Sequence, residues 1–358
     1  MESARETGQF ELWLAAWVGA LLDEMSVSNN SGTPGAKRST ALTVDDYVAG
    51  VLAGDRGILS RAITLIESQA PRHEEQAQEM LQRLLPRTGG AKRIGITGVP
   101  GVGKSTFIET FGCRLVERGH RTAVLTIDPS SIRSGGSILG DKTRMEKLSR
   151  EPHAFIRPSP AGGAPGGVAR RTRETMLVCE AAGFDTIIVE SVGVGQGEVA
   201  LRSMVDFYLL LQLPGAGDEL QGIKKGIVEL VDMVLINKAE GENRLRAELA
   251  RAEQEAALHY TNAATPEWRT EVALCSALTG EGIDHAWERI EHFYASLQLK
   301  GVIAERRRQQ TLDWLDEVLR DELRKRMLSD PRLPALQQAV LSGQMTVAAA
   351  ARKFFEPL

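Results

Sequence analysis

The chain contains few of the residues that mark disulfide-rich or metal-cluster proteins. Its 358 residues include three cysteines and six histidines, and aromatic side chains make up only 5% of the total. Cys113, Cys179 and Cys275 are scattered, and each lies in an apolar context. This spacing excludes a disulfide framework and indicates reduced core residues of a cytoplasmic protein. It also disfavours a Cys- or His-rich metal cluster.

The net charge is small, and the sequence has no apolar stretch long enough to span a membrane. The formal net charge is −4 with 25% charged residues, so no basic field predicts a nucleic-acid partner. The densest basic cluster, residues 306–308, is Arg-Arg-Arg at the start of a helical pattern, and we interpret it as a solvated face. An apolar stretch at residues 12–22 is too short to span a bilayer, and its acidic flanks do not fit a signal peptide. We expect no membrane segment; the stretch is either a short accessory helix or an extension upstream of a true start at Met25.

Composition divides the first part of the chain into two segments. Residues 1–40 are predicted to be a poorly ordered extension and linker, because residues 28–40 have almost nothing to bury. Residues 41–88 are predicted to form an N-terminal helical segment. Thr43 and Asp46 resemble a helix-capping box there, and two apolar stripes at helical spacing follow.

Residues 89–297 show short strand-like runs that alternate with helical stretches. This pattern predicts an α/β domain whose central sheet is mostly parallel. The predicted strands are Arg93–Thr97, Ala123–Ile127, Ile187–Val189, Phe207–Leu213, Met233–Ile236 and Val272–Cys275. Polar residues follow these runs directly, and ligands bind beyond the carboxyl ends of strands in such sheets. One site built from several strand ends is therefore expected.

Residues 298–358 are predicted to form a helical C-terminal arm. Five apolar residues recur every three or four positions, as an amphipathic helix requires: Leu312, Leu315, Leu319, Leu323 and Met327. The run Asp330–Pro334 ends that helix, and residues 335–355 predict a weaker one. The arm is too small for a core of its own. Its apolar stripe is covered either by the same chain or by a partner subunit.

The most informative motif is a complete phosphate-binding loop of the form G-x-x-x-x-G-K-[ST]. The motif and the residue after it are Gly98, Val99, Pro100, Gly101, Val102, Gly103, Lys104, Ser105 and Thr106. A strand-like run precedes the loop and a helical pattern follows it, so backbone N–H groups and a helix N-terminus would face a phosphate. Lys104 would reach the β- and γ-phosphates, and the Ser105 hydroxyl would bind Mg²⁺. The alternative is a glycine-rich turn without a ligand.

Three acidic residues are candidates for metal binding or for orienting water. Glu190 ends an apolar run as a Walker-B carboxylate does, Asp128 ends the preceding strand, and Asp141 lies in a polar stretch. Mg²⁺ prefers oxygen ligands, which these side chains supply. Taken singly, each is more often a helix cap or a solvated charge. The phosphate-binding loop favours the functional interpretation.

A second motif bears on the identity of the base. Asn237, Lys238 and Glu240 follow a predicted strand and resemble the guanine-reading pattern Asn-Lys-x-Asp. A carboxylate at the last position accepts from guanine N1–H and the exocyclic amine, a donor pair that adenine does not present. A backbone contact to the guanine carbonyl would come from residues after the next strand: Ser276, Ala277 and Leu278. GTP is therefore favoured over ATP, and ordinary strand-to-helix turn chemistry is the alternative.

Several longer runs resemble the MeaB/ArgK-type GTPases, which are SIMIBI-class P-loop NTPases. The runs are residues 98–106, 128–131, 135–145, 173–176, 190–196 and 213–226. The resemblance covers roughly residues 41–330. It implies GTP and GDP as ligands, and Mg²⁺ organised by Ser105, Asp128, Asp141 and Glu190. It also implies nucleotide-responsive switches around 128–145, 190–198 and 214–226, and homodimerisation through the C-terminal arm.

Two residues and one segment depart from the family pattern. Glu240 stands where the family usually has aspartate, Pro165 stands where it has leucine, and the first forty residues have no recognised counterpart. The first departure bears on guanine selectivity and the second on the conformation of that loop.

The family resemblance implies a GTPase chaperone for a cobalamin-dependent acyl-CoA mutase, with methylmalonyl-CoA mutase as the expected client. Hydrolysis would gate cobalamin loading and protect the mutase, with Lys104, Asp128 and Glu190 in the catalytic machinery. Two alternatives remain open: a lysine/arginine/ornithine (LAO/AO) transport-system ATPase or kinase, and a nickel-insertion GTPase of the same class. The Asn237-Lys238 motif disfavours the first, and dispersed His and Cys residues disfavour the second.

Overall fold

The computed structural model describes residues 42–68, 70–128, 145–160, 165–191, 197–215 and 225–356. Residues Thr43–Leu358 form one compact unit. The expectations for residues 1–40, for Asp141 and for most of the three switch regions lie outside the described residues, as does the side chain of Asp128. None of the helices in the described ranges is long and apolar enough to cross a membrane.

A seven-stranded, fully parallel sheet organises this unit, in the order β3-β2-β4-β1-β5-β6-β7. The strands are β1 (Lys92–Gly98), β2 (Thr122–Asp128), β3 (Ala154–Pro160), β4 (Thr186–Ser191), β5 (Phe207–Gln212), β6 (Met233–Ile236) and β7 (Glu271–Leu274). All six predicted strands are present. The strand order changes direction around β1, so the loop after β1 lies at the crevice where ligands bind in open α/β sheets.

The edge strand β3 is not predicted by the sequence pattern. Its sequence is Ala-Phe-Ile-Arg-Pro-Ser-Pro, and two prolines in a short run argue against a strand. β3 pairs only with β2, where Pro158 lies opposite Thr126 and Pro160 opposite Asp128. An edge strand tolerates proline because one side needs no backbone N–H donor.

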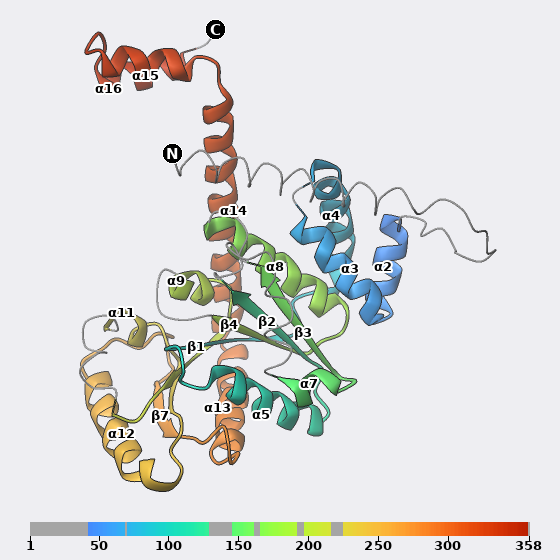
Figure 1. Ribbon diagram of the computed structural model, residues 1–358, viewed down its shortest axis with the longest axis vertical. Coiled ribbons are helices and arrows are strands. Elements are labelled where there is room, and N and C mark those ends of the chain that lie inside the picture. The colour runs from blue at the N-terminus through green and yellow to red at the C-terminus, as the bar shows by residue number, and fades with distance from the viewer. Residues whose placement is uncertain are drawn as a thin grey trace, which may run out of the picture. The chain divides into compact units, whose positions relative to one another are not determined.

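Helices cover both faces of the sheet (Figure 1). On one face, α5 (Lys104–Glu117) and α13 (Ile283–Gln298) bury an aromatic cluster against the strands, with Phe111 6.0 Å from Trp287 and Phe207 5.0 Å from Phe293 between ring centres. On the other face lie α8 (Pro165–Ala181) and α9 (Gly197–Arg202). The remaining helices of this α/β part are α7 (Glu146–Arg150), α11 (Lys225–Val228), η3 (Gly241–Asn243) and α12 (Arg244–Leu258).

The N-terminal helices pack together and against α8. They are α2 (Val44–Leu52), α3 (Arg56–Glu67), α4 (Pro71–Leu84) and the short η1 (Leu85–Arg87). The predicted capping box is confirmed, because the Thr43 hydroxyl accepts from the Asp46 N–H and the Asp46 carboxylate accepts from the Thr43 N–H. Gln78 of α4 donates to Glu174 of α8 at 2.9 Å, which ties the two groups of helices together.

The C-terminal segment contains three helices: α14 (Val302–Ser329), α15 (Leu333–Leu341) and α16 (Val347–Phe355). The long amphipathic helix is confirmed. The single weaker helix expected over residues 335–355 is wrong in detail, because the chain turns between α15 and α16 at Gly343, whose φ is +72°. The Thr346 side chain then caps α16 by accepting from the Ala349 N–H.

The basic cluster at residues 306–308 is not a solvated face, which corrects the interpretation from sequence. Arg306 and Arg307 are largely buried, with side-chain exposures of 13% and 19%. Arg307 forms a 2.6 Å ion pair with the fully buried Asp206. Only Arg308 conforms to the prediction, since it is exposed and pairs with Glu305. Helical periodicity places two of three adjacent arginines towards the sheet. The carboxylates that pair with them, Asp232 with Arg306 and Asp206 with Arg307, belong to distant parts of the chain.

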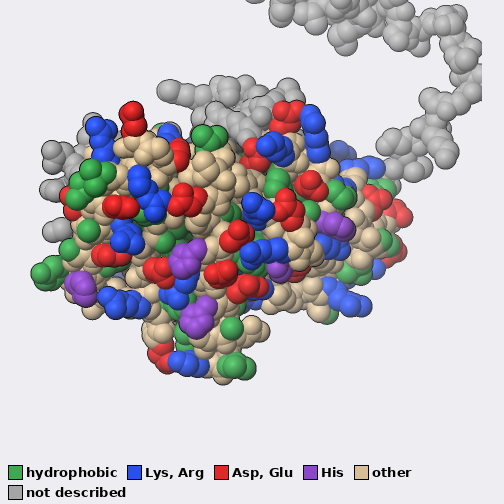
Figure 2. Space-filling model, turned by 90° about the horizontal axis from the view of Figure 1, so that it is seen from below, with side chains coloured by type: hydrophobic (Ala, Val, Ile, Leu, Met, Phe, Trp, Pro, Cys, Tyr) green, Lys and Arg blue, Asp and Glu red, His purple; other side chains and the backbone are tan. Residues whose placement is uncertain are grey.

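Figure 2 shows acidic and basic side chains interspersed over the face of the molecule seen from below. Several such side chains form exposed ion pairs, for example Arg118 with Asp284 at 2.9 Å and Lys300 with Glu267 at 2.5 Å. Exposed pairs of this kind contribute about 0–1 kcal/mol each. The stability of the fold therefore depends on the buried apolar core and on the buried pairs.

Candidate nucleotide-binding site

The loop after β1 has the backbone shape that a phosphate cradle needs. Gly101 and Gly103 have φ of +78° and +95°, a left-handed conformation that side chains with a Cβ adopt at a cost. Gly103 is the N-cap of α5, and Val102 between them is fully buried and holds the loop to the core. The positive end of α5 therefore lies at this loop, as anion binding requires.

Lys104 lies over the loop rather than in solvent. Its ammonium donates to the carbonyl oxygens of Gly98 at 2.8 Å and Val99 at 3.2 Å, and the residue is 8% exposed. Burial lowers the pKa of Lys104, and the nearby Glu190 carboxylate opposes that shift. A cation held at the mouth of a phosphate cradle can bind a phosphate without first being ordered.

Two oxygen-bearing side chains meet beside the loop. The Ser105 hydroxyl donates to Glu190 Oε1 at 3.4 Å. Glu190 lies at the end of β4, opposite Ile96 of β1, and is 7% exposed. The next residue, Ser191, donates to the Thr97 hydroxyl at 2.8 Å and fixes the strand end. A hydroxyl and a carboxylate at this separation fit the oxygen preference of Mg²⁺.

The two further acids proposed as metal ligands are not placed as side chains. The backbone of Asp128 ends β2, and its neighbour Ile127 lies opposite Ser191 of β4. The β2 and β4 ends therefore adjoin. Asp141 lies outside the described residues. Across those residues, no group of three or more His, Cys, Asp or Glu side chains could hold a metal ion.

Asn237 joins three parts of the site. Its amide nitrogen donates to the Val102 carbonyl at 2.8 Å, and its amide oxygen accepts from the Ala277 N–H at 2.9 Å. Cys275 Sγ also approaches that oxygen at 3.5 Å. The phosphate loop, the end of β6 and the segment after β7 are thus fixed relative to one another by one buried side chain.

Lys238 of the same motif contacts the loop, and Glu240 holds a buried oxygen. Lys238 has a φ of +62°, and its ammonium donates to the Gly101 carbonyl at 3.0 Å. Glu240 Oε2 is buried and has no hydrogen-bond partner among the described residues. An unpaired buried acceptor costs about 1–3 kcal/mol. A ligand with N–H donors at this point, as guanine has, would satisfy Glu240.

Hydrogen bonds fix the segment after β7, which adjoins Asn237. Ser276 is fully buried, and its hydroxyl accepts from the Thr279 N–H at 3.1 Å. The Ala277 carbonyl accepts from the Thr110 hydroxyl at 2.8 Å, whereas Leu278 is 78% exposed. Thr110 was not predicted from sequence. It belongs to no motif, but it is a polar residue within the apolar pattern of α5, and that signal could have identified it.

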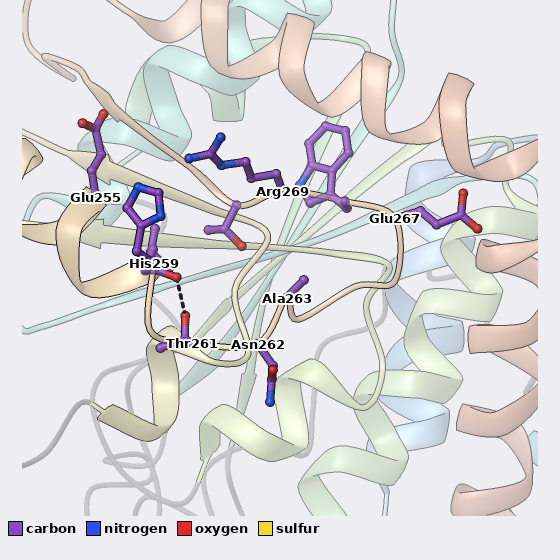
Figure 3. Close-up of a pocket in the computed structure, with 10 residues that line it drawn as sticks. Glu255, His259, Thr261, Asn262, Ala263, Glu267 and Arg269 are labelled. Carbon is purple, nitrogen blue, oxygen red and sulfur yellow. Dashed lines mark hydrogen bonds between the residues drawn. The ribbon is translucent and has the colours of Figure 1, made fainter.

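A separate hollow of about 400 Å³ lies at the other end of the strands (Figure 3). It is formed by the C-terminal end of α12 and the segment that leads into β7, and His259, Thr261 and Arg269 are among its lining residues. The Thr261 hydroxyl donates to the Leu258 carbonyl at 3.1 Å. This hollow is at the amino-terminal side of the strands, so it is distinct from the site beyond their carboxyl ends.

Comparisons with known proteins agree with this geometry. Residues 59–332 match the family described as "Methylmalonyl Co-A mutase-associated GTPase MeaB". The chain is 46% identical over 281 residues to the GTPase ArgK of Escherichia coli, which covers 78% of this chain and 85% of that protein. It is 43% identical over 322 residues to the mouse (Mus musculus) "Methylmalonic aciduria type A homolog, mitochondrial", which covers 86% of this chain and 78% of that protein.

A solved structure also aligns along most of the chain. The crystal structure of a protein named "LAO/AO transport system kinase" superposes with a TM-score of 0.72 at 35% identity, and the alignment covers 89% of this chain and 98% of that one. The sequence match, the relatives named as GTPases and this structural match cover the same P-loop fold. The chain therefore belongs to the methylmalonyl-CoA mutase-associated MeaB family of nucleotide-binding GTPases.

Proposed function

We propose that this GTPase uses GTP hydrolysis to gate cobalamin loading and to protect a cobalamin-dependent acyl-CoA mutase, with methylmalonyl-CoA mutase as the client. The family description names association with that mutase, and the mouse relative is named for methylmalonic aciduria. The observation that carries the nucleotide half of the proposal is the contact of Asn237 and Lys238 with the phosphate loop.

In this proposal the phosphates lie in the loop Gly98–Ser105, and the base lies between Asn237, Glu240 and the segment Ser276–Leu278. Glu240 accepts from the guanine N–H donors, which gives selectivity against adenine. Lys104 exchanges its loop carbonyl partners for phosphate oxygens. Its charge then faces the β- and γ-phosphates, where charge develops during phosphoryl transfer.

We propose Ser105 and Glu190 as protein ligands or second-sphere ligands for Mg²⁺, with Asp128 and Asp141 added by family resemblance. A bound Mg²⁺ neutralises charge on the phosphates. Glu190 and Asp128 are also positioned at strand ends where a carboxylate can orient water. None of the described residues has been identified as an arginine finger, and we therefore propose slow intrinsic turnover that the client accelerates.

We further propose a homodimer formed through the C-terminal arm, residues 298–358, next to a GTPase domain of residues 89–297 and an N-terminal helical segment of residues 41–88. The apolar face of α14 is about half exposed along its length: Leu312, Leu315, Leu319 and Leu323 are 46%, 54%, 53% and 59% exposed. An apolar cleft of about 650 Å³ between α15 and α16 continues this surface. A second copy would cover both.

The proposed cycle runs in the cytoplasm, where reduced thiols persist. Cys113, Cys179 and Cys275 are free, and two of the three are buried. Burial raises the pKa of Cys179 and Cys275, which keeps these thiols protonated and unreactive.

The alternative is a kinase or transport ATPase, as the name of the structurally similar protein suggests. Hydrolysis assays with GTP and with ATP, each with and without purified methylmalonyl-CoA mutase, distinguish the two. We expect slow GTP hydrolysis that the mutase accelerates, little ATP hydrolysis, and retention of the mutase in a pull-down under a GTP analogue. The Lys104→Ala variant is the inactive control. A high basal rate that the mutase leaves unchanged, or equal use of ATP, would contradict the proposal.

A further inference from the structure

The nucleotide site and the C-terminal arm are joined by the turn at the end of α9, residues 201–206, which we call the α9 turn. α9 is the first described element after Glu190 and Ser191. The α9 turn packs directly on β1, the strand that leads into the phosphate loop. A Cβ at Gly95 of β1 would lie only 2.9 Å from a methyl group of Val205 and 3.2 Å from Leu201 Cγ. Such close packing would transmit a movement of β1 to this turn.

α14 contacts the same turn with one face. Gln310 donates from its amide nitrogen to the Val205 carbonyl at 2.9 Å and to the Arg202 carbonyl at 3.3 Å. One turn earlier in α14, Arg306 donates to the backbone carbonyl of Asp206 and to the Thr265 hydroxyl. The backbone carbonyls of Arg202, Val205 and Asp206 thus accept hydrogen bonds from α14 side chains.

Arg173 of α8 bridges the two helices from the side. Its guanidinium donates to the Ser203 hydroxyl at 2.6 Å and to the Ser203 carbonyl at 3.3 Å. The other terminal nitrogen donates to Glu317 of α14 at 3.3 Å, and the guanidinium carbon lies 5.6 Å from the centre of the Trp314 ring. Arg173 is 8% exposed, so few of these contacts compete with water.

The contacts with the α9 turn and the exposed leucines lie on different sides of α14. At 100° per residue, Arg306, Gln310, Trp314 and Glu317 fall within about 80° of one another, and Leu312, Leu315, Leu319 and Leu323 are centred on the opposite side. One face of α14 is therefore hydrogen-bonded to the nucleotide domain. The other face is free, within the described residues, to bind a protein partner.

We infer that α14 transmits the nucleotide state of the site to the C-terminal arm. In this inference Gln310 and Arg173 couple the position of the α9 turn to the arm. Both act as positioning residues. The inference rests on the proposed role of Glu190 beside the bound nucleotide, and it goes further by naming the path to the arm. Because coupling between two sites is reciprocal for binding free energies, a change in α14 must also change the affinity for nucleotide.

The competing explanation is that α14 only stabilises the fold, and it makes a different prediction. If α14 only supports the fold, Gln310→Ala and Arg173→Lys lower stability and leave the difference between nucleotide states unchanged. If α14 is coupled to the site, each variant changes that difference while the protein stays folded. Gln309→Ala is the matched control, because Gln309 is exposed and donates only within α14, to Asp313 at 2.8 Å.

The test is hydrogen–deuterium exchange of the full chain with Mg²⁺ and either GDP or a non-hydrolysable GTP analogue, with the affinity of each nucleotide measured on the same samples. In the wild type we expect amide exchange in residues 306–320 to differ between the two states by roughly two- to thirtyfold. Gln310→Ala and Arg173→Lys should abolish the difference, and Gln309→Ala should keep it. The ratio of the affinities for the GTP analogue and for GDP should change in the first two variants only.

The outcomes separate this inference from the proposed function. Tight binding of both nucleotides with identical exchange in α14 would overturn the coupling alone. Failure of the wild type to bind guanine nucleotides would overturn the nucleotide site and the coupling with it. If Arg173→Lys does not fold, Gln310→Ala decides the matter, since it removes only one side-chain amide.

Discussion

Gly103 shows how closely two motifs of this site depend on each other. Its φ of +95° is unfavourable for any residue with a Cβ, and a Cβ built there would lie 2.9 Å from the Asn237 amide nitrogen. That amide also holds the Val102 carbonyl. We expect Gly103→Ala to lower the free energy of unfolding by about 2–4 kcal/mol, from backbone strain and a displaced buried hydrogen bond. Chemical denaturation of the nucleotide-free protein measures this.

Gly101→Ala is the matched control for that experiment. Gly101 has a similar φ of +78°, but nothing lies within 4 Å of a Cβ placed on it. Its substitution should cost only the strain, about 1–2 kcal/mol. Equal losses in the two variants would show that the contact with Asn237 contributes nothing to stability.

Glu240 carries a second prediction at this scale. Replacing its carboxylate by an amide in Glu240→Gln puts an N–H₂ group where guanine donors would otherwise bind. We expect the affinity for GDP to fall by about 2–3 kcal/mol, roughly thirty- to a hundred-and-fiftyfold, with stability of the nucleotide-free protein unchanged or raised, because Oε2 is unpaired there. Calorimetric titration with GDP and ADP measures both affinities.

The control for Glu240 is the shorter carboxylate. Glu240→Asp restores the residue that the family pattern usually has, and it keeps an acceptor at this place. We expect it to retain preference for GDP over ADP. A loss of GDP affinity as large as that of Glu240→Gln would mean that the reach of the longer side chain, and not its charge, is what the site requires.

Among the elements, those with strong local signals were predictable from sequence and those defined by distant partners were not. The phosphate loop, its flanking strand and helix, and the Asn237 segment follow from residue spacing alone. β3 could not be predicted, because only its place at the sheet edge makes Pro158 and Pro160 acceptable. Arg306 and Arg307 were wrongly predicted to be exposed. The carboxylate of Asp206 pairs with Arg307 in the interior, and no local sequence pattern relates these residues.

Asp206 predicts how the attachment of α14 responds to acid. Burial would raise the pKa of its carboxyl, but hydrogen bonds and the charge of Arg307, the charge of Arg93 and the hydroxyl of Tyr294 bring it below its ordinary value. A pKa that is lower in the folded state stabilises the protein above the unfolded pKa, and this stabilisation is lost as pH falls through the folded value. We expect the free energy of unfolding to decline below about pH 4 for this reason.

Asp206→Asn tests that account. The variant leaves Arg307 buried without a counter-charge, so we expect it to lose about 3–5 kcal/mol at neutral pH. It should also show a weaker dependence on pH below about pH 4 in urea unfolding. Asp284→Asn removes an ion pair whose carboxylate is 51% exposed and should cost no more than about 1 kcal/mol. A pH profile of Asp206→Asn parallel to that of the wild type would assign the acid transition to other groups.

At the scale of the whole molecule, α14 combines two functions on one helix. Its first turns are fixed by buried charges and by the α9 turn, and its outer length presents leucines that the described residues leave about half exposed. α15 and α16 lie at the end of the arm (Figure 1). The apolar cleft between them extends this surface. A monomer would expose both to water, and that exposure is the physical argument for the proposed dimer.

The double variant Leu315→Glu/Leu319→Glu tests the dimer. Full burial of one leucine contributes about 1.5–3 kcal/mol, so loss of two should raise the dimer Kd by at least a hundredfold. We expect light scattering coupled to size-exclusion chromatography to show a dimer for the wild type and a monomer for the variant. Asp321→Lys, an exposed change on the other side of α14, should remain dimeric. Because both leucines point away from the α9 turn, the variant should keep basal GTP hydrolysis. A monomeric wild type, or a variant that stays dimeric, would contradict a dimer formed through this face of α14.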